Sequence, residues 1–352
     1  MLIRKAVVHV LFFTFVSVAI HSQPFKSLAF VDKVSVPHDQ SHGNFSVQLP
    51  MKCGADGTIY IRFAGAGSEP TVTLIRDDGK IASEIRLRAI PEFTENTVYD
   101  FAPGNGDVLV LSAKGKPHTQ TIWYVSRFKT DGSYVSSVKV ETGFKPDFEP
   151  LHIAAFPSGD LLIAGITKGH KGDEVASVPF VGIFGADGEF QRQLVTQRDV
   201  GKEDVKHKAS DKAISEDEQI RNLLEVSYLQ TGDDGNAYLM RHTPSGPVFV
   251  VSPGGVVRRV ALVPPVKGAD LQWIVPSGGV IAAQYRSTDP GERKTHYLTV
   301  VDSSTSTVRE TIRYLHDYQS TGGGMACYQH GTFTFIAGAP DNKLQLVKAI
   351  AQ

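Results

Sequence analysis

The chain has 352 residues, of which 41% are hydrophobic, enough to bury a large core. Its 36 basic and 37 acidic residues give a formal net charge of −1. This balance excludes a general electrostatic attraction to nucleic acid or anionic membranes, so neither is expected as a partner.

Residues 1–22 have the pattern of a cleaved signal peptide. Arg4 and Lys5 supply a basic start, and an apolar stretch runs from Ala6 to Ile20. This stretch is interrupted by His9 and is shorter than the roughly 20 residues that a membrane-spanning helix needs. We therefore expect an exported protein, periplasmic or extracellular, without a membrane span.

One pattern then recurs six times: a short apolar strand, a turn that contains glycine, and a second apolar strand. The clear copies are FAPGNGDVLVLS from Phe101, FPSGDLLIAG from Phe156 and VPSGGVIAAQY from Val275. Weaker copies begin at Cys53, Gln230 and Cys327. The equivalent glycines are 49, 53, 76, 44 and 52 residues apart, and four of these intervals fit the blades of a β-propeller.

Each copy but the last is followed by a second hairpin. Its turns include Asp78-Gly79, Asp131-Gly132 and Asp187-Gly188, which are dipeptides that tolerate positive φ. The repeating unit is therefore four antiparallel strands. Residues 44–352 are predicted to form one all-β domain, a six-bladed β-propeller, after a lead-in segment at residues 23–43.

The sixth copy ends at Gln352 without an outer strand. An unpaired strand edge favours aggregation, so another segment must cover it. The segment NFSVQL, Asn44 to Leu49, precedes the first copy, and we predict that it closes the ring against the sixth blade.

The strand–Gly–Asp–strand motifs GDVLVLS and GDLLIAG give the chain its family likeness. It resembles the six-bladed propellers of the NHL-repeat and TolB-like kind over residues 44–352. The resemblance implies an architecture and leaves the activity open, because such propellers include binding scaffolds, lactonases and lyases.

Propeller geometry places the hairpin turns inside each blade on one face, here the turn face, and all other loops on the opposite one, the loop face. The turns are short and uniform, whereas the loop-face segments 168–177, 286–295 and 199–224 vary. Variable loops on a rigid scaffold are where binding is usually found. In the charged insertion 199–224, between blades three and four, Ser215 and Glu218 form a capping box that predicts a short helix, either a lid or a solvated insertion.

Alignment on the glycines places Glu95, Glu149 and Glu225 at one equivalent position, where the innermost strands begin on the loop face. Such carboxylates could hold a divalent cation, with Glu149 and Glu225 as the metal candidates, or share a raised pKa for acid–base work. The alternative is that they are simply solvated. The other three blades have Gly268, Thr321 and Val47 there.

His152 follows Glu149 by three residues on an innermost strand, where it is either a ligand or base or a packed core histidine. His170 with Asp173, and His242, are further candidates on the loop face.

No nucleophile elbow, P-loop, HExxH motif or dinucleotide fingerprint occurs. We therefore favour a non-catalytic, monomeric binding module for a protein, peptide or carbohydrate. The alternative is a metal-assisted hydrolase or lyase, lactonase-like, at the mouth of the central channel.

Cys53 and Cys327 each precede a blade glycine by four residues, so they occupy equivalent positions in the first and last blades. Equivalent side chains point the same way around a ring. Two buried thiols are therefore expected here and not a disulfide.

Overall fold

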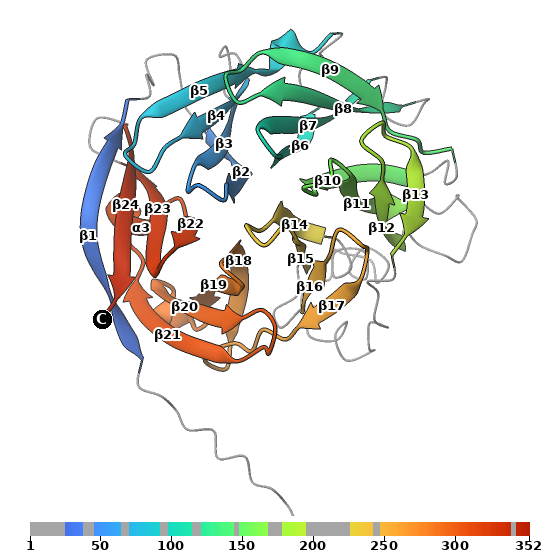
Figure 1. Ribbon diagram of the computed structural model, residues 1–352. Coiled ribbons are helices and arrows are strands. Elements are labelled where there is room, and N and C mark those ends of the chain that lie inside the picture. The colour runs from blue at the N-terminus through green and yellow to red at the C-terminus, as the bar shows by residue number, and fades with distance from the viewer. Residues whose placement is uncertain are drawn as a thin grey trace, which may run out of the picture.

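The computed structural model describes residues 25–37, 46–64, 70–91, 98–114, 121–143, 148–167, 178–194, 226–241, 247–338 and 343–352. These segments are almost entirely β-strand, and the sheets stand around a common centre (Figure 1). They contain one short α-helix, α3 (Tyr318–Thr321), and the 3₁₀ turns η1 (Leu87–Ala89) and η2 (Pro290–Glu292). Within these segments no helix has the length and apolar character to cross a bilayer. The all-β prediction is confirmed, whereas the predicted helix at 216–224 lies outside the described residues.

Four of the sheets are four-stranded and follow the chain from inside to outside. The first contains β2 (Ser46–Cys53), β3 (Ile59–Ala64), β4 (Thr71–Ile75) and β5 (Ile81–Arg86). The second contains β6 (Val98–Pro103), β7 (Asp107–Lys114), β8 (Ile122–Lys129) and β9 (Tyr134–Lys139). The third contains β10 (Phe148–Ala155), β11 (Leu161–Thr167), β12 (Val178–Phe184) and β13 (Phe190–Gln193). The fourth contains β14 (Val226–Thr231), β15 (Ala237–Arg241), β16 (Val248–Val251) and β17 (Val257–Val260).

The remaining strands form one eight-stranded sheet in the order β18-β19-β20-β21-β1-β24-β23-β22. One half contains β18 (Ala269–Ser277), β19 (Val280–Ser287), β20 (Thr295–Asp302) and β21 (Val308–Leu315). The other half contains β22 (Met325–Gln329), β23 (Thr332–Gly338), β24 (Leu344–Ala351) and β1 (Lys26–Val36). The halves meet where β1 pairs with β21 through two residue pairs, at Lys26 and Ser27.

Asp–Gly sequences form the outer hairpin turns, as their chemistry predicts. The Asp78 carboxylate accepts the Lys80 N–H at 3.0 Å, and Gly79 has φ +78°. The turn at Asp131 is built in the same way, and its Gly132 has φ +90°. Both glycines occupy the left-handed region, where a side chain is strained, so each repeat is punctuated by a sequence that can turn there.

The hydrophobic core lies between neighbouring sheets. Leu111, Val125 and Phe180 fill the space between the second and third sheets, for example, and all three are buried. Adjacent sheets therefore pack face to face around the ring, which leaves the innermost strands to line the axis (Figure 1).

The ring is closed by β1 and not by Asn44 to Leu49, so that prediction is wrong. β1 runs antiparallel along β24, from Leu28 opposite Ala351 to Val36 opposite Leu344. Its place outside β24 is visible in Figure 1. Counting the first repeat from Cys53 leaves no residues for its innermost strand. Ser46–Cys53 supplies that strand as β2, so closure falls to the segment before it.

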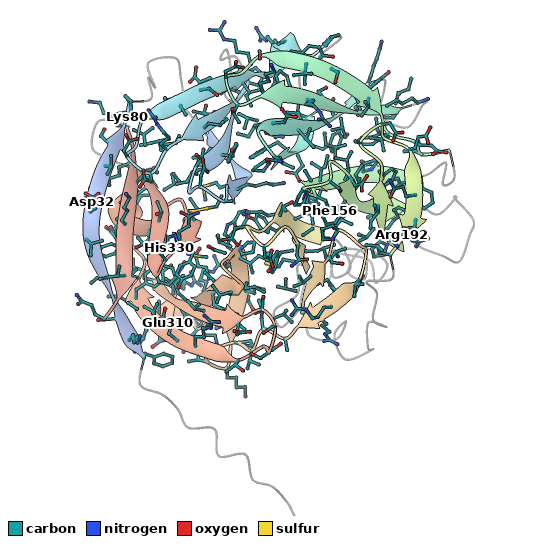
Figure 2. The ribbon with its side chains drawn as sticks, viewed as in Figure 1. Asp32, Lys80, Phe156, Arg192, Glu310 and His330 are labelled. Atoms are coloured by element: carbon teal, nitrogen blue, oxygen red, sulfur yellow. A yellow bond between two sulfur atoms is a disulfide. The ribbon has the colours of Figure 1, made fainter. Side chains whose placement is uncertain are left out.

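Cys53 and Cys327 form a disulfide, with Cα atoms 5.1 Å apart, so the prediction of two buried thiols is also wrong. The bond joins β2 to β22, the innermost strands of neighbouring parts of the ring (Figure 2). The Cα separation lies within the range that disulfides require.

Turn length explains this error. The β2–β3 turn is closed by Gly54 and Thr58, and the β22–β23 turn by Gln329 and Thr332, so the second turn is one residue shorter. Counted from these closing pairs, the first cysteine is one residue away and the second is two. An offset of one residue turns a strand side chain to the opposite face, so the two sulfur atoms point toward each other.

Candidate functional site at the propeller axis

The innermost strands of the first three sheets converge at the axis, and each is interrupted by a β-bulge. The register shifts lie between Gln48 and Lys52, between Val98 and Asp100, and between Pro150 and His152. A bulge re-aims the side chain that follows it. The first paired residue after each bulge is ionisable: Lys52 in β2, Asp100 in β6 and His152 in β10.

Lys52 and Asp100 form an ion pair in which both side chains are 0% exposed. The Lys52 ammonium donates to Asp100 Oδ2 at 2.9 Å and to the Ile153 carbonyl oxygen at 3.0 Å. The Ile153 N–H donates to the same carboxylate oxygen at 2.9 Å. The ammonium also lies 5.3 Å from the centre of the Phe101 ring. One strand from each of three sheets is thereby joined at a single buried point.

His152 is the solvent-facing member of this cluster. Its side chain is 16% exposed, and its Nδ1 lies 3.6 Å from Asp100 Oδ2. That separation is longer than a normal hydrogen bond. Neither His152 Nδ1 nor the second carboxylate oxygen, Asp100 Oδ1, has a hydrogen-bond partner among the described residues. The cluster thus retains one buried acceptor beside an imidazole that water can reach.

Charge and burial act against each other in this pair. Burial lowers the pKa of Lys52, and the Asp100 carboxylate opposes that shift. Burial raises the pKa of Asp100, but the charges of Lys52 and His152 outweigh it, so the net pKa lies below the ordinary value. The Lys52 ammonium beside it therefore keeps the buried carboxylate ionised.

The fourth sheet is bonded directly to the first across the axis. The side-chain amide of Gln230, on β14, donates to the Cys53 carbonyl at 2.8 Å and accepts from the Cys53 N–H at 3.3 Å. The Tyr228 hydroxyl lies 3.3 Å from the Met51 carbonyl and also contacts the Gln230 amide oxygen. Tyr228 is completely buried and packs on Trp273, with ring centres 4.6 Å apart.

Within the described segments, no three His, Cys, Asp or Glu residues are close enough together to hold a metal ion. At Asp100 the position that a divalent cation would need is taken by the Lys52 ammonium.

Of the predicted site residues, Glu149 and His152 are described, and both lie on β10, separated by its bulge. Glu149 faces Tyr99, whose pKa is raised by burial and by the glutamate charge. The others lie outside the described residues: Glu95, His170, Asp173, Glu225 and His242.

Sequence reasoning missed Lys52 and Asp100. Alignment on glycines hid the equivalence of Asp100 and His152, because the turns differ by one residue in length. Counted back from the last inner-strand residue, Pro103 or Ala155, each lies three positions away. A charged residue inside an otherwise apolar inner strand was the signal available, as in VYDFAP.

No family model and no curated protein sequence matches the chain, whereas solved structures do. One is a protein of unknown function from Dyadobacter fermentans, 9% identical with a TM-score of 0.52, over 93% of this chain and 100% of that one. A putative gluconolactonase is 13% identical with a TM-score of 0.45, over 93% of this chain and 90% of that one. A subtype N10 neuraminidase-like protein of A/little yellow-shouldered bat/Guatemala/060/2010 is 10% identical with a TM-score of 0.45, over 92% and 100%. At such identities a likeness concerns the fold alone, and the four-stranded sheets around a common axis make this fold a β-propeller.

Proposed function

We propose that the protein is an exported, non-catalytic binding propeller that engages a carbohydrate, protein or peptide on its loop face. The observation that carries this proposal is the bonding at the axis. Lys52 and Asp100 bond each other and the Ile153 backbone, and Gln230 bonds the Cys53 backbone across the axis. Such a cluster holds neighbouring sheets together, so we assign ligand recognition to the segments of the loop face.

The proposed propeller has six blades, of the NHL-repeat or TolB-like kind. The eight-stranded sheet counts as two blades because its halves share only the two residue pairs between β1 and β21. Within each half, neighbouring strands pair along most of their length. β1 then serves as the outer strand of the sixth blade.

Export is supported by two independent features. Residues 1–22 have the pattern of a signal peptide, and the Cys53–Cys327 disulfide requires an oxidising compartment. The mature N-terminus, determined by mass spectrometry of protein recovered outside the cytoplasm, tests this part of the proposal. Cleavage near residue 22 is expected, and an intact Met1 in a cytoplasmic fraction would contradict it.

Binding is tested with oligosaccharide and peptide arrays and three forms of the protein. In one variant the loop-face segments 168–177 and 286–295 are replaced by short Gly-Ser linkers. The control variant, Lys80→Ala with Glu189→Ala, alters exposed residues of the turn face. We expect the loop-face variant to lose array binding and the control to keep it. Binding that survives the loop exchange, or turnover of a bound compound, would overturn the proposal.

The metal-assisted alternative makes a separate prediction. The Lys52 ammonium already neutralises Asp100, so we expect the purified mature protein to hold no stoichiometric divalent cation at the axis. Elemental analysis of the wild type and of Glu149→Gln and Glu225→Gln variants measures this directly. One equivalent of metal that either substitution removes would favour the hydrolase or lyase.

A further inference from the structure

A group of basic side chains gathers on the loop face. It comprises Arg286, Lys294, His296 and His316, and we call it the basic corner. Arg286 on β19 lies directly opposite His296 on β20, so the two side chains share one face of the sheet. The rings of His296 and His316 stack, with centres 4.7 Å apart and an interplanar angle of 13°. The Lys294 carbonyl accepts the His316 N–H at 2.6 Å, which brings the lysine backbone to the same place.

The two permanent cations of the basic corner, Arg286 and Lys294, are exposed. Among the described residues, neither Arg286 nor Lys294 forms an ion pair. Four acidic residues lie nearby. Asp270 on β18 is opposite Arg286 in the strand register but forms no ion pair with it, and Glu292 pairs with Arg313 at 3.0 Å. Asp289 accepts the Gly291 N–H at 2.8 Å, and Asp317 accepts from the Ser320 hydroxyl at 3.1 Å.

His296 adds a buried polar atom with nothing to bond. The residue is only 8% exposed, and its Nδ1 has no hydrogen-bond partner among the described residues. A buried nitrogen without a partner has lost its hydration and gained no hydrogen bond in exchange, which destabilises the protein locally. By contrast, Nδ1 of His316 bonds the Thr321 hydroxyl at 3.1 Å, which fixes the ring that covers His296.

We propose that the basic corner binds the carboxylate or sulfate groups of an acidic polysaccharide, an assignment that rests on the proposed binding role of the loop face. Two exposed cations without an ion-pair partner match an oxyanion. Tyr318, 71% exposed and two residues beyond His316, offers an aromatic surface for a sugar ring. An acidic peptide fits less well, because β20 is paired on both edges and offers no free edge for an added strand.

The test is calorimetry on the intact mature protein with oligogalacturonate, dextran sulfate, neutral dextran and polyglutamate as probes. We expect one or both acidic carbohydrates to bind, more weakly as salt rises, and neutral dextran not to bind. Arg286→Gln with Lys294→Gln should weaken that binding at least tenfold. The matched control, Lys80→Gln with Arg259→Gln, removes the same charge elsewhere and should leave binding unchanged. Oligogalacturonate carries carboxylates and dextran sulfate carries sulfates, so comparing their affinities shows which anionic group the protein recognises.

Three results would overturn the inference: no binding of either acidic carbohydrate, equal weakening by the two double variants, or polyglutamate bound as tightly as the carbohydrates. Unchanged thermal unfolding of both double variants verifies that neither has lost its fold. If the Gly-Ser loop exchange abolishes array binding while Arg286→Gln with Lys294→Gln has no effect, the basic corner is wrong and the loop-face function stands.

Discussion

This propeller has two clusters of ionisable side chains, and they differ in how deeply their charged groups are buried. Lys52 and Asp100 are fully buried at the axis and form an ion pair. At the basic corner, Arg286 and Lys294 are exposed above a buried histidine. A sealed pair contributes to the joint between sheets, whereas exposed unpaired charge is available to a ligand.

Removing one member of the axial pair should be more harmful than removing both. Lys52→Met leaves the Asp100 carboxylate buried and unpaired, so we expect the free energy of unfolding to fall by about 3–5 kcal/mol. Lys52→Met with Asp100→Leu removes both charges and should recover part of that loss. Urea denaturation of the three proteins measures both effects. A double variant no more stable than the single one would show that the pair is not what holds Asp100.

The free energy of unfolding of the protein should depend on pH through His296, over a defined pH range. Burial, followed by the charges of His316 and Arg286, lowers the pKa of His296 to about 4. Between pH 6.5 and 4 the unfolded chain therefore takes up a proton that folded His296 refuses, so stability falls as pH drops through this range. The expected loss is about 1–2 kcal/mol between pH 7 and 4.5.

A His296→Gln variant isolates that contribution. Its free energy of unfolding should fall less steeply than that of the wild type over the same pH range, because all other groups are shared. Parallel curves for the two proteins would contradict the lowered pKa of His296.

Local turn chemistry could be predicted from the sequence, because an Asp–Gly turn depends on four or five neighbouring residues. The positions of Asp100 and His152 could not, because bulges and turn lengths shift each inner strand by single residues. A one-residue shift decides whether a side chain faces the axis or a neighbouring sheet. Of the axial cluster, the sequence therefore indicated His152 alone, and Lys52 and Asp100 emerged only with the register.

At the scale of elements, the ring is held closed by β1 and by the disulfide. β1 pairs with β24 over most of its length and satisfies what would otherwise be an open sheet edge. The disulfide joins residues 274 positions apart near the axis. Both contacts are long-range pairings, and no local sequence signal specifies which distant strand an N-terminal segment will meet. This is why the strand units were predictable and the closure was not.

Loss of the disulfide should weaken the closed ring strongly. In the chain-entropy view, a cross-link over so long a loop stabilises the fold by about 4–5 kcal/mol. Cys53→Ala with Cys327→Ala should therefore unfold at markedly lower urea concentration than the oxidised wild type. Adding dithiothreitol should shift the wild type toward the variant and leave the variant unchanged. Two free thiols in the untreated wild type would contradict the bond itself.

At the scale of the whole molecule, the two faces of the propeller have different designs. Short Asp–Gly turns of one kind recur on the turn face, whereas the loop face carries the variable segments and the basic corner. The exposed residues Asp32 and Arg192 and the half-buried Glu310 lie around the outer wall (Figure 2). The innermost strands are hydrogen-bonded to one another at the axis, and one face carries variable loops. This arrangement is suited to presenting a binding surface.

Hydrogen–deuterium exchange of the mature protein, with and without a bound acidic oligosaccharide, tests this account most directly, because it maps the ligand onto one face. We predict that protection appears at residues 286–296 and 313–318 and that the turn-face hairpins around residues 104–107 and 157–160 exchange as before. Protection confined to the turn face, or to the axial strands β6 and β10, would contradict a binding site on the loop face.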